Sequence, residues 1–83
     1  MAKRQITRWH VSRFPATANR AAYAYVILHG REPHGLFGSS HSLVSETFHI
    51  PLAPDAPRDN AANQALVKQA IDLSANEWTG RIP

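Results

Sequence analysis

The sequence predicts an α+β fold, in which an antiparallel three-stranded sheet is followed by one long amphipathic helix packed on one face (βββα). Two observations predict it: strand periodicity recurs through the first 52 residues, and helical periodicity begins only after a proline-rich segment. The chain of 83 residues is long enough to build one hydrophobic core. We therefore expect a single domain over residues 1–83, with a flexible N-terminus at residues 1–4.

The first strand is expected over residues 5–14. Ile6, Arg8 and His10 alternate with Trp9 and Val11, which leaves one side of the strand mostly polar. A strand with one polar side is typical of a position near the edge of a sheet. The residues that follow form a connection, because proline cannot donate to a sheet ladder and asparagine favours turns.

The second strand, residues 22–29, is apolar on both sides, which predicts a central position in the sheet. A hairpin loop is expected over residues 30–35, which have glycine at both ends and Pro33 inside. Residues 36–52 then return antiparallel. Because Gly38 interrupts their alternation, one bent strand is favoured over two short ones.

The helix follows a proline-rich segment. Three prolines spaced by three residues predict an extended crossover over residues 51–58. Asp59 is the expected N-cap of a helix over residues 59–78, and Gly80 is its expected stop. Apolar side chains gather on one half of this helix and polar ones on the other, so one half packs on the sheet.

A single helix can cover only one face of the sheet, so the other face is left to water or to a partner. If the small residues Ala24 and Val26 lie beneath the helix, then Tyr23 and Tyr25 lie on the uncovered face. Exposed aromatic patches of this kind mark interaction sites. The reverse assignment, with the bulky set in the core, is the alternative.

Charge is distributed unevenly along the chain, whose formal net charge is +3. Residues 1–31 carry six basic side chains and no acidic one, whereas residues 32–83 carry three basic and six acidic side chains. A basic end of this kind fits nucleic acid or an acidic protein surface. The alternative is a solvated basic edge strand that discourages sheets from aggregating.

The sequence offers no apparatus for catalysis. It has no cysteine, its five histidines do not stand at metal-ligand spacings, and its six acidic residues are scattered. Serines surround His41, but no nucleophile elbow and no phosphate-binding loop occur. We expect no enzymatic activity, no metal and no cofactor. The longest apolar run is too short for a membrane span, so we expect a cytoplasmic protein without membrane contact.

The succession of three strands and a helix resembles, over most of the chain, the partial ribonuclease-H-like layout of HicB-type antitoxins. It is also similar to the layout of some phage-encoded anti-CRISPR proteins. Such proteins are short and non-catalytic, and they act by blocking a protein or nucleic-acid surface. The resemblance, which is one of topology, implies an inhibitor from a phage or another mobile element.

The leading hypothesis is a small non-enzymatic protein-binding module that blocks a surface of a larger protein or ribonucleoprotein complex. Its binding surface combines aromatic anchors with basic residues. Self-association through the same patch, giving a homodimer, is an alternative use of it. The predicted partner-binding residues are Trp9, Tyr23, Tyr25, Arg8, Arg13 and Arg20.

The alternative from another class is a nucleic-acid-binding accessory protein. Its basic N-terminal strand would bind phosphates and its aromatic sheet face would stack on bases. The helix is a poor reader of the major groove, because Lys68 is its only basic residue. The residues predicted for this alternative are Lys3, Arg4, Arg8, Arg13, Arg20 and Arg31.

Overall fold

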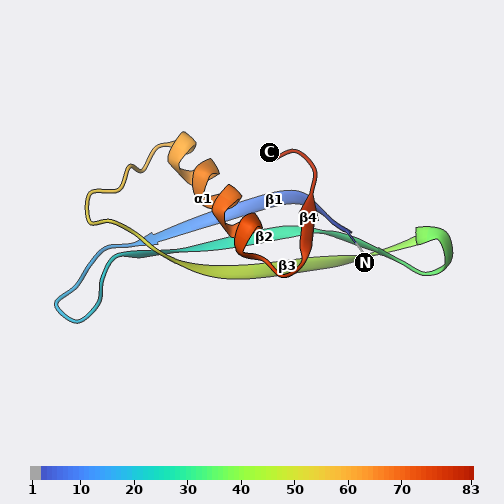
Figure 1. Ribbon diagram of the computed structural model, residues 1–83, viewed down its shortest axis with the longest axis horizontal. Coiled ribbons are helices and arrows are strands. Elements are labelled where there is room, and N and C mark those ends of the chain that lie inside the picture. Colours follow the sequence, from blue (N-terminus) through green and yellow to red (C-terminus); the bar gives the residue numbers. More distant parts are fainter. Residues whose placement is uncertain (1–2) are drawn as a thin grey trace.

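The computed structural model describes residues 3–83 and is an α+β fold with one mixed four-stranded sheet and one helix (Figure 1). The strand order is β3-β2-β1-β4, in which the first three strands along the chain form an antiparallel meander and β4 pairs parallel to β1. The α+β class is confirmed. The sheet differs from the predicted antiparallel three-stranded one because it has a fourth strand, β4, which pairs parallel to β1. The elements are β1 (Lys3–Phe14), β2 (Tyr23–His34), a 3-10 turn η1 (Leu36–Gly38), β3 (Ser40–Pro51), α1 (Asn60–Leu73) and β4 (Glu77–Thr79).

β4 makes the structure at both ends of the chain differ from the prediction. Lys3 and Arg4, which the sequence places in a flexible N-terminus, belong to β1 and pair with Glu77 and Trp78 of β4. Residues 1–2, the rest of that predicted segment, lie outside the described residues. The parallel pairing joins segments from opposite ends of the chain, so no local sequence pattern indicates it.

α1 begins as predicted and ends earlier. Asp59 is the N-cap, since its carboxylate accepts a backbone N–H of the first turn at 2.9 Å. The predicted helix continues to Trp78, but α1 ends at Leu73 because Ser74 leaves the helical conformation and its hydroxyl accepts a nearby backbone N–H at 3.0 Å. Trp78 enters the core from β4 instead. No helix in the described part of the chain is long and apolar enough to cross a membrane.

The β2–β3 hairpin is longer than the sequence predicts. The predicted loop covers residues 30–35, but β2 runs through Gly30 to His34 and the chain reverses around η1. Gly30 lies within the strand at a position that requires glycine, because a Cβ atom there would clash with the Gln5 carbonyl oxygen and the Trp78 ring. β3 is one strand with an unbroken register against β2. Gly38 belongs to the turn, not to a bend within β3.

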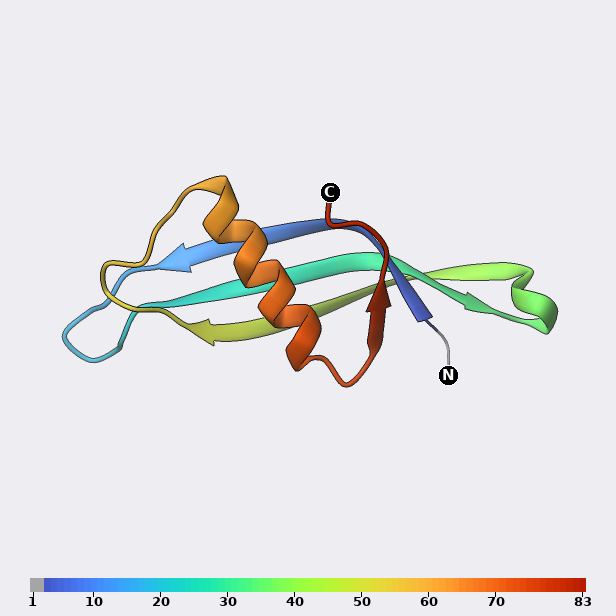
Figure 2. The same ribbon diagram turned by 45° about the horizontal axis from the view of Figure 1, so that its top comes forward.

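α1 crosses the sheet on one face only (Figure 2). The small and aliphatic residues of β2 lie beneath it and are fully buried. This confirms the prediction that the tyrosines of β2 lie on the face that the helix does not cover, and excludes the reverse arrangement. Trp78 extends the same core over Gly30. The core consists of Ile6, Ala24, Val26, Leu28, Ile50, Leu66, Val67, Ala70 and Trp78.

A β-bulge at Thr7 turns Ile6 into this core. β1 and β2 keep a regular register from Phe14 to Arg8, and the register then shifts between Arg8 and Ile6. Strict alternation places Ile6 on the same side as Arg8, but the extra residue turns it to the core side, where it is buried. The Thr7 hydroxyl stabilises the bulge by donating to the His29 carbonyl oxygen at 3.2 Å.

The Glu46 carboxylate lies on the helix-covered side of the sheet and binds side chains from several segments. Its Oε1 accepts hydrogen bonds from Ser74 Oγ at 2.7 Å, Trp78 Nε1 at 2.8 Å and Asn76 Nδ2 at 3.2 Å, and Arg4 Nη1 lies 3.7 Å away. Burial works to raise the pKa of Glu46, but these hydrogen bonds and the charge of Arg4 outweigh it, so the pKa is lowered. One carboxylate thus links β3 to β1, β4 and the segment after α1.

Replacing Glu46 by glutamine is expected to lower the free energy of unfolding by about 1–3 kcal/mol at neutral pH, because charge-assisted hydrogen bonds are weakened and Arg4 loses one of its two carboxylate partners. Since the pKa is lowered in the folded state, the stabilisation is complete above the ordinary carboxyl value of 4.5 and is lost as the pH falls through the lowered value. Urea unfolding of both proteins, at neutral pH and in acid, measures the difference, which should shrink in acid.

Glu77→Gln is the control for this experiment. It removes only an ion pair of 3.8 Å to Lys3 between two exposed side chains, so it should cost about 0.5 kcal/mol or less. Equal losses in the two variants would contradict the role assigned to Glu46.

Candidate functional site

The sheet face opposite α1, here termed the open face, is covered by no helix or strand of residues 3–83 (Figure 1, Figure 2). Directly paired residues of neighbouring strands share a face, so the register assigns the side chains of the three long strands. The open face comprises Lys3, Gln5, Arg8, His10, Ser12 and Phe14 of β1, Tyr23, Tyr25, Ile27, His29, Arg31 and Pro33 of β2, and His41, Leu43, Ser45, Thr47, His49 and Pro51 of β3.

Four rings at one end of the open face pack together and form the aromatic cluster, which comprises Phe14, Tyr23, Tyr25 and His49. Tyr23 is stacked between Phe14 and His49, with ring centroids 4.9 Å and 4.6 Å away. Tyr25 meets the other three rings edge to face at 5.4 to 5.6 Å. Tyr23 is thereby only 8% exposed, while Tyr25 and Phe14 stay 37% and 38% exposed. The cluster has a buried centre and an accessible rim.

Arg20 extends this cluster toward the turn between β1 and β2. Its Nη1 donates to the Tyr23 hydroxyl at 2.9 Å, and its Cζ lies 4.9 Å from the Tyr23 ring centroid. A shallow cavity of about 500 Å³, open to solvent, lies beside it. An aromatic wall beside a guanidinium suits a planar group that carries negative charge. The cavity is lined by Phe14, Pro15, Thr17, Asn19, Arg20 and Tyr23.

On the three long strands, the open face carries basic side chains and no carboxylate. Arg8 and Arg31 lie on it together with four histidines, and Arg20 borders it. On β4 it carries Glu77, which is paired with Lys3 of the same face at 3.8 Å. The long strands contain two acidic residues, and both bind Arg4 on the helix-covered side: Glu32 at 3.3 Å and Glu46 at 3.7 Å. The other acidic residues lie in the crossover, on α1 and on β4.

The arginines of the open face have no carboxylate partner. The ion pairs found within residues 3–83 involve only Lys3 and Arg4 as cations. Arg8, Arg20 and Arg31 are exposed. Their charge is therefore available to a ligand.

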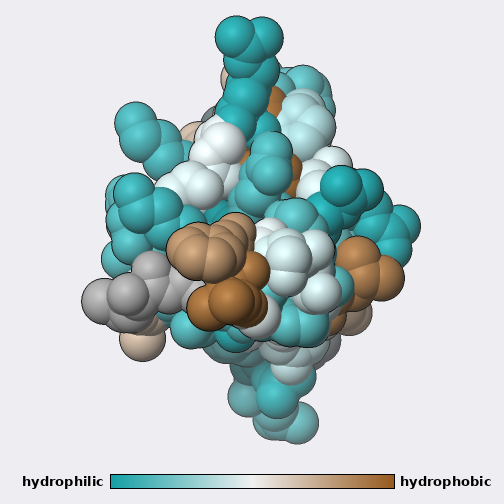
Figure 3. All heavy atoms as spheres, turned by 90° about the vertical axis from the view of Figure 1, so that its right-hand side faces the viewer, coloured by the Kyte–Doolittle hydropathy of each residue, from teal (hydrophilic) through white to brown (hydrophobic). Residues whose placement is uncertain are grey.

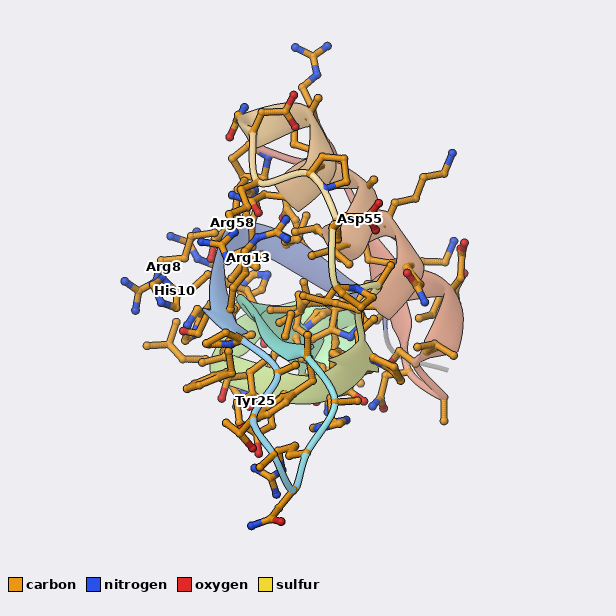
Figure 4. All side chains as sticks on the ribbon, turned by 90° about the vertical axis from the view of Figure 1, so that its left-hand side faces the viewer. Arg8, His10, Arg13, Tyr25, Asp55 and Arg58 are labelled. Carbon is orange, nitrogen blue, oxygen red and sulfur yellow. The ribbon has the colours of Figure 1, made fainter. Side chains whose placement is uncertain are left out.

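The structure divides the six residues predicted to bind a partner. Tyr25 lies on the side of the sheet away from α1, and Arg8 points outward from β1 beside His10 (Figure 4). Tyr23 and Arg20 belong to the same side.

Trp9 and Arg13 lie on the other side, because each alternates with the open-face residues of β1. Trp9 packs against the core and its Nε1 donates to the Pro83 carbonyl oxygen at 2.8 Å. Arg13 donates twice to Asn63 Oδ1 of α1, at 3.1 Å and 2.8 Å. Trp9 therefore holds the C-terminal segment onto the sheet, and Arg13 holds α1 onto it.

The six residues of the nucleic-acid alternative divide in the same way. Arg8, Arg20 and Arg31 are on or beside the open face, whereas Lys3 and Arg4 are paired with acidic residues and Arg13 is bonded to α1.

Two residues of the aromatic cluster, Phe14 and His49, are absent from the predicted sites, although the two-residue alternation of their strands indicates them. Arg58, outside the open face, has no such signal: it lies in the crossover and, with Arg13, lines a cavity of about 80 Å³ (Figure 4). Only the tertiary fold brings these two arginines to one cavity.

The tip of the β2–β3 hairpin is an apolar protrusion. Leu36, Phe37 and Leu43 are 77%, 96% and 87% exposed. Figure 3 looks onto this end of the molecule and shows an apolar patch among hydrophilic residues. Phe37, whose ring lies in solvent, has a φ of 58°, an unfavourable conformation for an aromatic residue.

Within residues 3–83, no three histidine, aspartate or glutamate side chains are grouped to hold a metal ion. No known protein family matches the chain, and no curated protein or solved structure is significantly similar to it. The function is therefore argued from the chemistry of the open face.

The two tyrosines of the cluster should respond differently to truncation. Tyr23→Ala removes the buried, doubly stacked ring and is expected to lower the free energy of unfolding by about 3 kcal/mol or more. Tyr25→Ala removes a rim residue and should cost about 1 kcal/mol. Thermal unfolding measures both. A loss at Tyr25 as large as that at Tyr23 would show that Tyr25 belongs to the structural core and not to the accessible rim.

Proposed function

We propose that this protein binds single-stranded nucleic acid on the open face. The observation that carries the proposal is the composition of that face: unpaired arginines and accessible aromatic rings, with every carboxylate of the three long strands on the opposite side. Proteins that bind single strands combine a positive surface for the backbone with rings on which bases stack.

The layout of the open face supports a division of labour along the strands. Arg8 and Arg31 lie toward one end of the face and bind phosphates, while Tyr25 and Phe14 lie at the other end and stack on bases. Arg20 adds a cation beside the cavity at that end, where its guanidinium is already oriented by Tyr23.

Single strands are favoured over duplexes by the position of α1. The helix packs with its apolar half on the opposite face and carries Lys68 as its only basic residue, so it has little to offer a duplex groove. A duplex would also keep its bases stacked on each other and away from Tyr25.

Arg8→Ala is expected to weaken binding to a fluorescent oligonucleotide of about 12 unpaired nucleotides. If Arg8, Arg20 and Arg31 each neutralise one phosphate, the slope of log K against log salt is about −2, and the substitution reduces its magnitude by about 0.7. Fluorescence anisotropy over a salt series measures both quantities. Lys68→Ala, which removes the same charge from α1, is the matched control and should leave the slope unchanged.

Tyr25→Ala completes this test, because loss of a stacking ring should weaken binding at every salt concentration without changing the slope. Equal effects of Arg8→Ala and Lys68→Ala would indicate general charge attraction and would contradict a site on the open face.

A second candidate function is the blocking of a larger protein, and the hairpin tip is the observation that favours it. An isolated, fully exposed aromatic side chain on a projecting hairpin is the kind of anchor that inserts into a partner's pocket. Such contact depends on apolar burial, so it should barely respond to salt, in contrast to phosphate binding.

Phe37→Gly tests this second candidate without harming the fold. Glycine accepts the positive φ at position 37, so the variant should be as stable as the natural protein or slightly more stable. In nuclease-treated pull-downs from the native cell, the natural protein should retain a protein partner at moderate salt, and Phe37→Gly should fail to retain it. A partner retained by Phe37→Gly would exclude the tip as its binding site.

A further inference from the structure

The two edges of the sheet are protected to different extents. The edge at β1 is partly covered by β4, is distorted by the bulge at Thr7 and carries Arg8 and Arg13. Coverage, bulges and charges are the usual means by which proteins prevent an edge strand from pairing with another chain. The edge at β3 has none of these.

β3 is a long and regular edge strand. It runs from Ser40 to Pro51, with a register against β2 that is unbroken from end to end. It contains no lysine or arginine, and its only proline is the last residue. Its one acidic residue, Glu46, is engaged on the helix-covered side and cannot repel an approaching strand.

The direction of the backbone groups of β3 follows from its neighbours. The Leu52 N–H donates to the Ala22 carbonyl oxygen of the β2 side at 3.0 Å. Since backbone groups alternate along a strand, the even-numbered residues of β3 bond to β2 and the odd-numbered residues direct N–H and C=O outward. Pro51, which lacks an N–H, stands at an outward position where no donor is missed.

We propose that the free edge of β3 pairs antiparallel with β3 of a second copy of this chain. The strand suits its own copy because its outward positions, among them Ser45, Thr47 and His49, are uncharged or weakly basic. A register centred on Thr47 places Leu43, which is 87% exposed, opposite Pro51 of the other copy and keeps the two Glu46 carboxylates out of direct opposition. The arginines of the open face lie on or near β1 and β2 and not on the contacting strand.

The symmetry of such a pair has a definite consequence. An antiparallel ladder between identical strands has its two-fold axis perpendicular to the sheet, so the two copies form one continuous sheet with both helices on one side. The open faces then form one surface on the other side. The inference does not rest on nucleic-acid binding and is tested in the absence of nucleic acid.

The test is the mass of the full chain in solution from about 1 µM to about 1 mM, by light scattering or sedimentation. The natural protein should pass from monomer to dimer within this range. Ser45→Lys places a charge at the edge and should raise the dissociation constant at least about tenfold. Ser12→Lys, the same change on the same face of β1, is the matched control and should leave the dimer intact.

Thr47→Pro provides a second variant, because it removes an outward donor without removing a bond to β2. It should give a folded monomer, as judged by an unchanged circular dichroism spectrum. A natural protein that stays monomeric over the whole range, or a dimer that tolerates both edge variants, would overturn the inference.

The absence of cysteine makes the register testable as well. A single cysteine introduced as Thr47→Cys can form a disulfide only with its equivalent in another copy, and residues directly opposite in a ladder lie within disulfide range. Mild oxidation should convert this variant to a covalent dimer much faster than Gln64→Cys, whose position is exposed on α1. Equal rates for the two variants would contradict the proposed pairing.

Discussion

The Glu46 carboxylate holds together the parts of the fold that are most distant in sequence. It accepts hydrogen bonds from the segment after α1 and from Trp78, and it faces Arg4 of β1. One side chain thus joins β3 to segments near both ends of the described chain. The ion pair with Arg4 also keeps the negative charge of Glu46 on the helix-covered side of the sheet. With Glu32 bound to the same arginine, the acidic residues of the three long strands are neutralised beside the helix and are absent from the other face.

The second constraint is the size of the chain, which provides one helix for a sheet with two sides. Ala24, Val26 and Leu28 are small or aliphatic and accept the close approach of α1, so the bulky residues of β2 must lie on the opposite face. There the rings satisfy part of their need for burial by packing on one another, which leaves Tyr23 inaccessible and Tyr25 accessible. The open face is thus both a small secondary core and a surface available to a ligand.

The alternation of apolar and polar residues along the sequence predicted the elements that depend on neighbouring residues. The three long strands, the N-cap at Asp59 and the face of β2 beneath the helix all follow from alternation or from short-range hydrogen bonding. The features that escaped prediction depend on contacts between distant segments: β4 pairs with the other end of the chain, and Gly30 is read as a loop residue until Trp78 is seen to cover it. Trp9 and Arg13 resemble surface anchors in the sequence, yet their partners, Pro83 and Asn63, lie in segments that only the tertiary fold brings near.

The bulge at Thr7 shows that β1 has one residue more than its ladder with β2 requires. The additional residue allows Ile6 to face the core although it stands two positions from Arg8, which faces outward. A gene encoding this strand should therefore accept many amino-acid replacements at position 7 and even the loss of its codon, since Ile6 and Arg8 would then be neighbours and ordinary alternation would keep them on opposite sides. The loss of a codon within the regular part of the strand, from position 9 to position 13, would instead exchange the charged and apolar sides on one side of the gap.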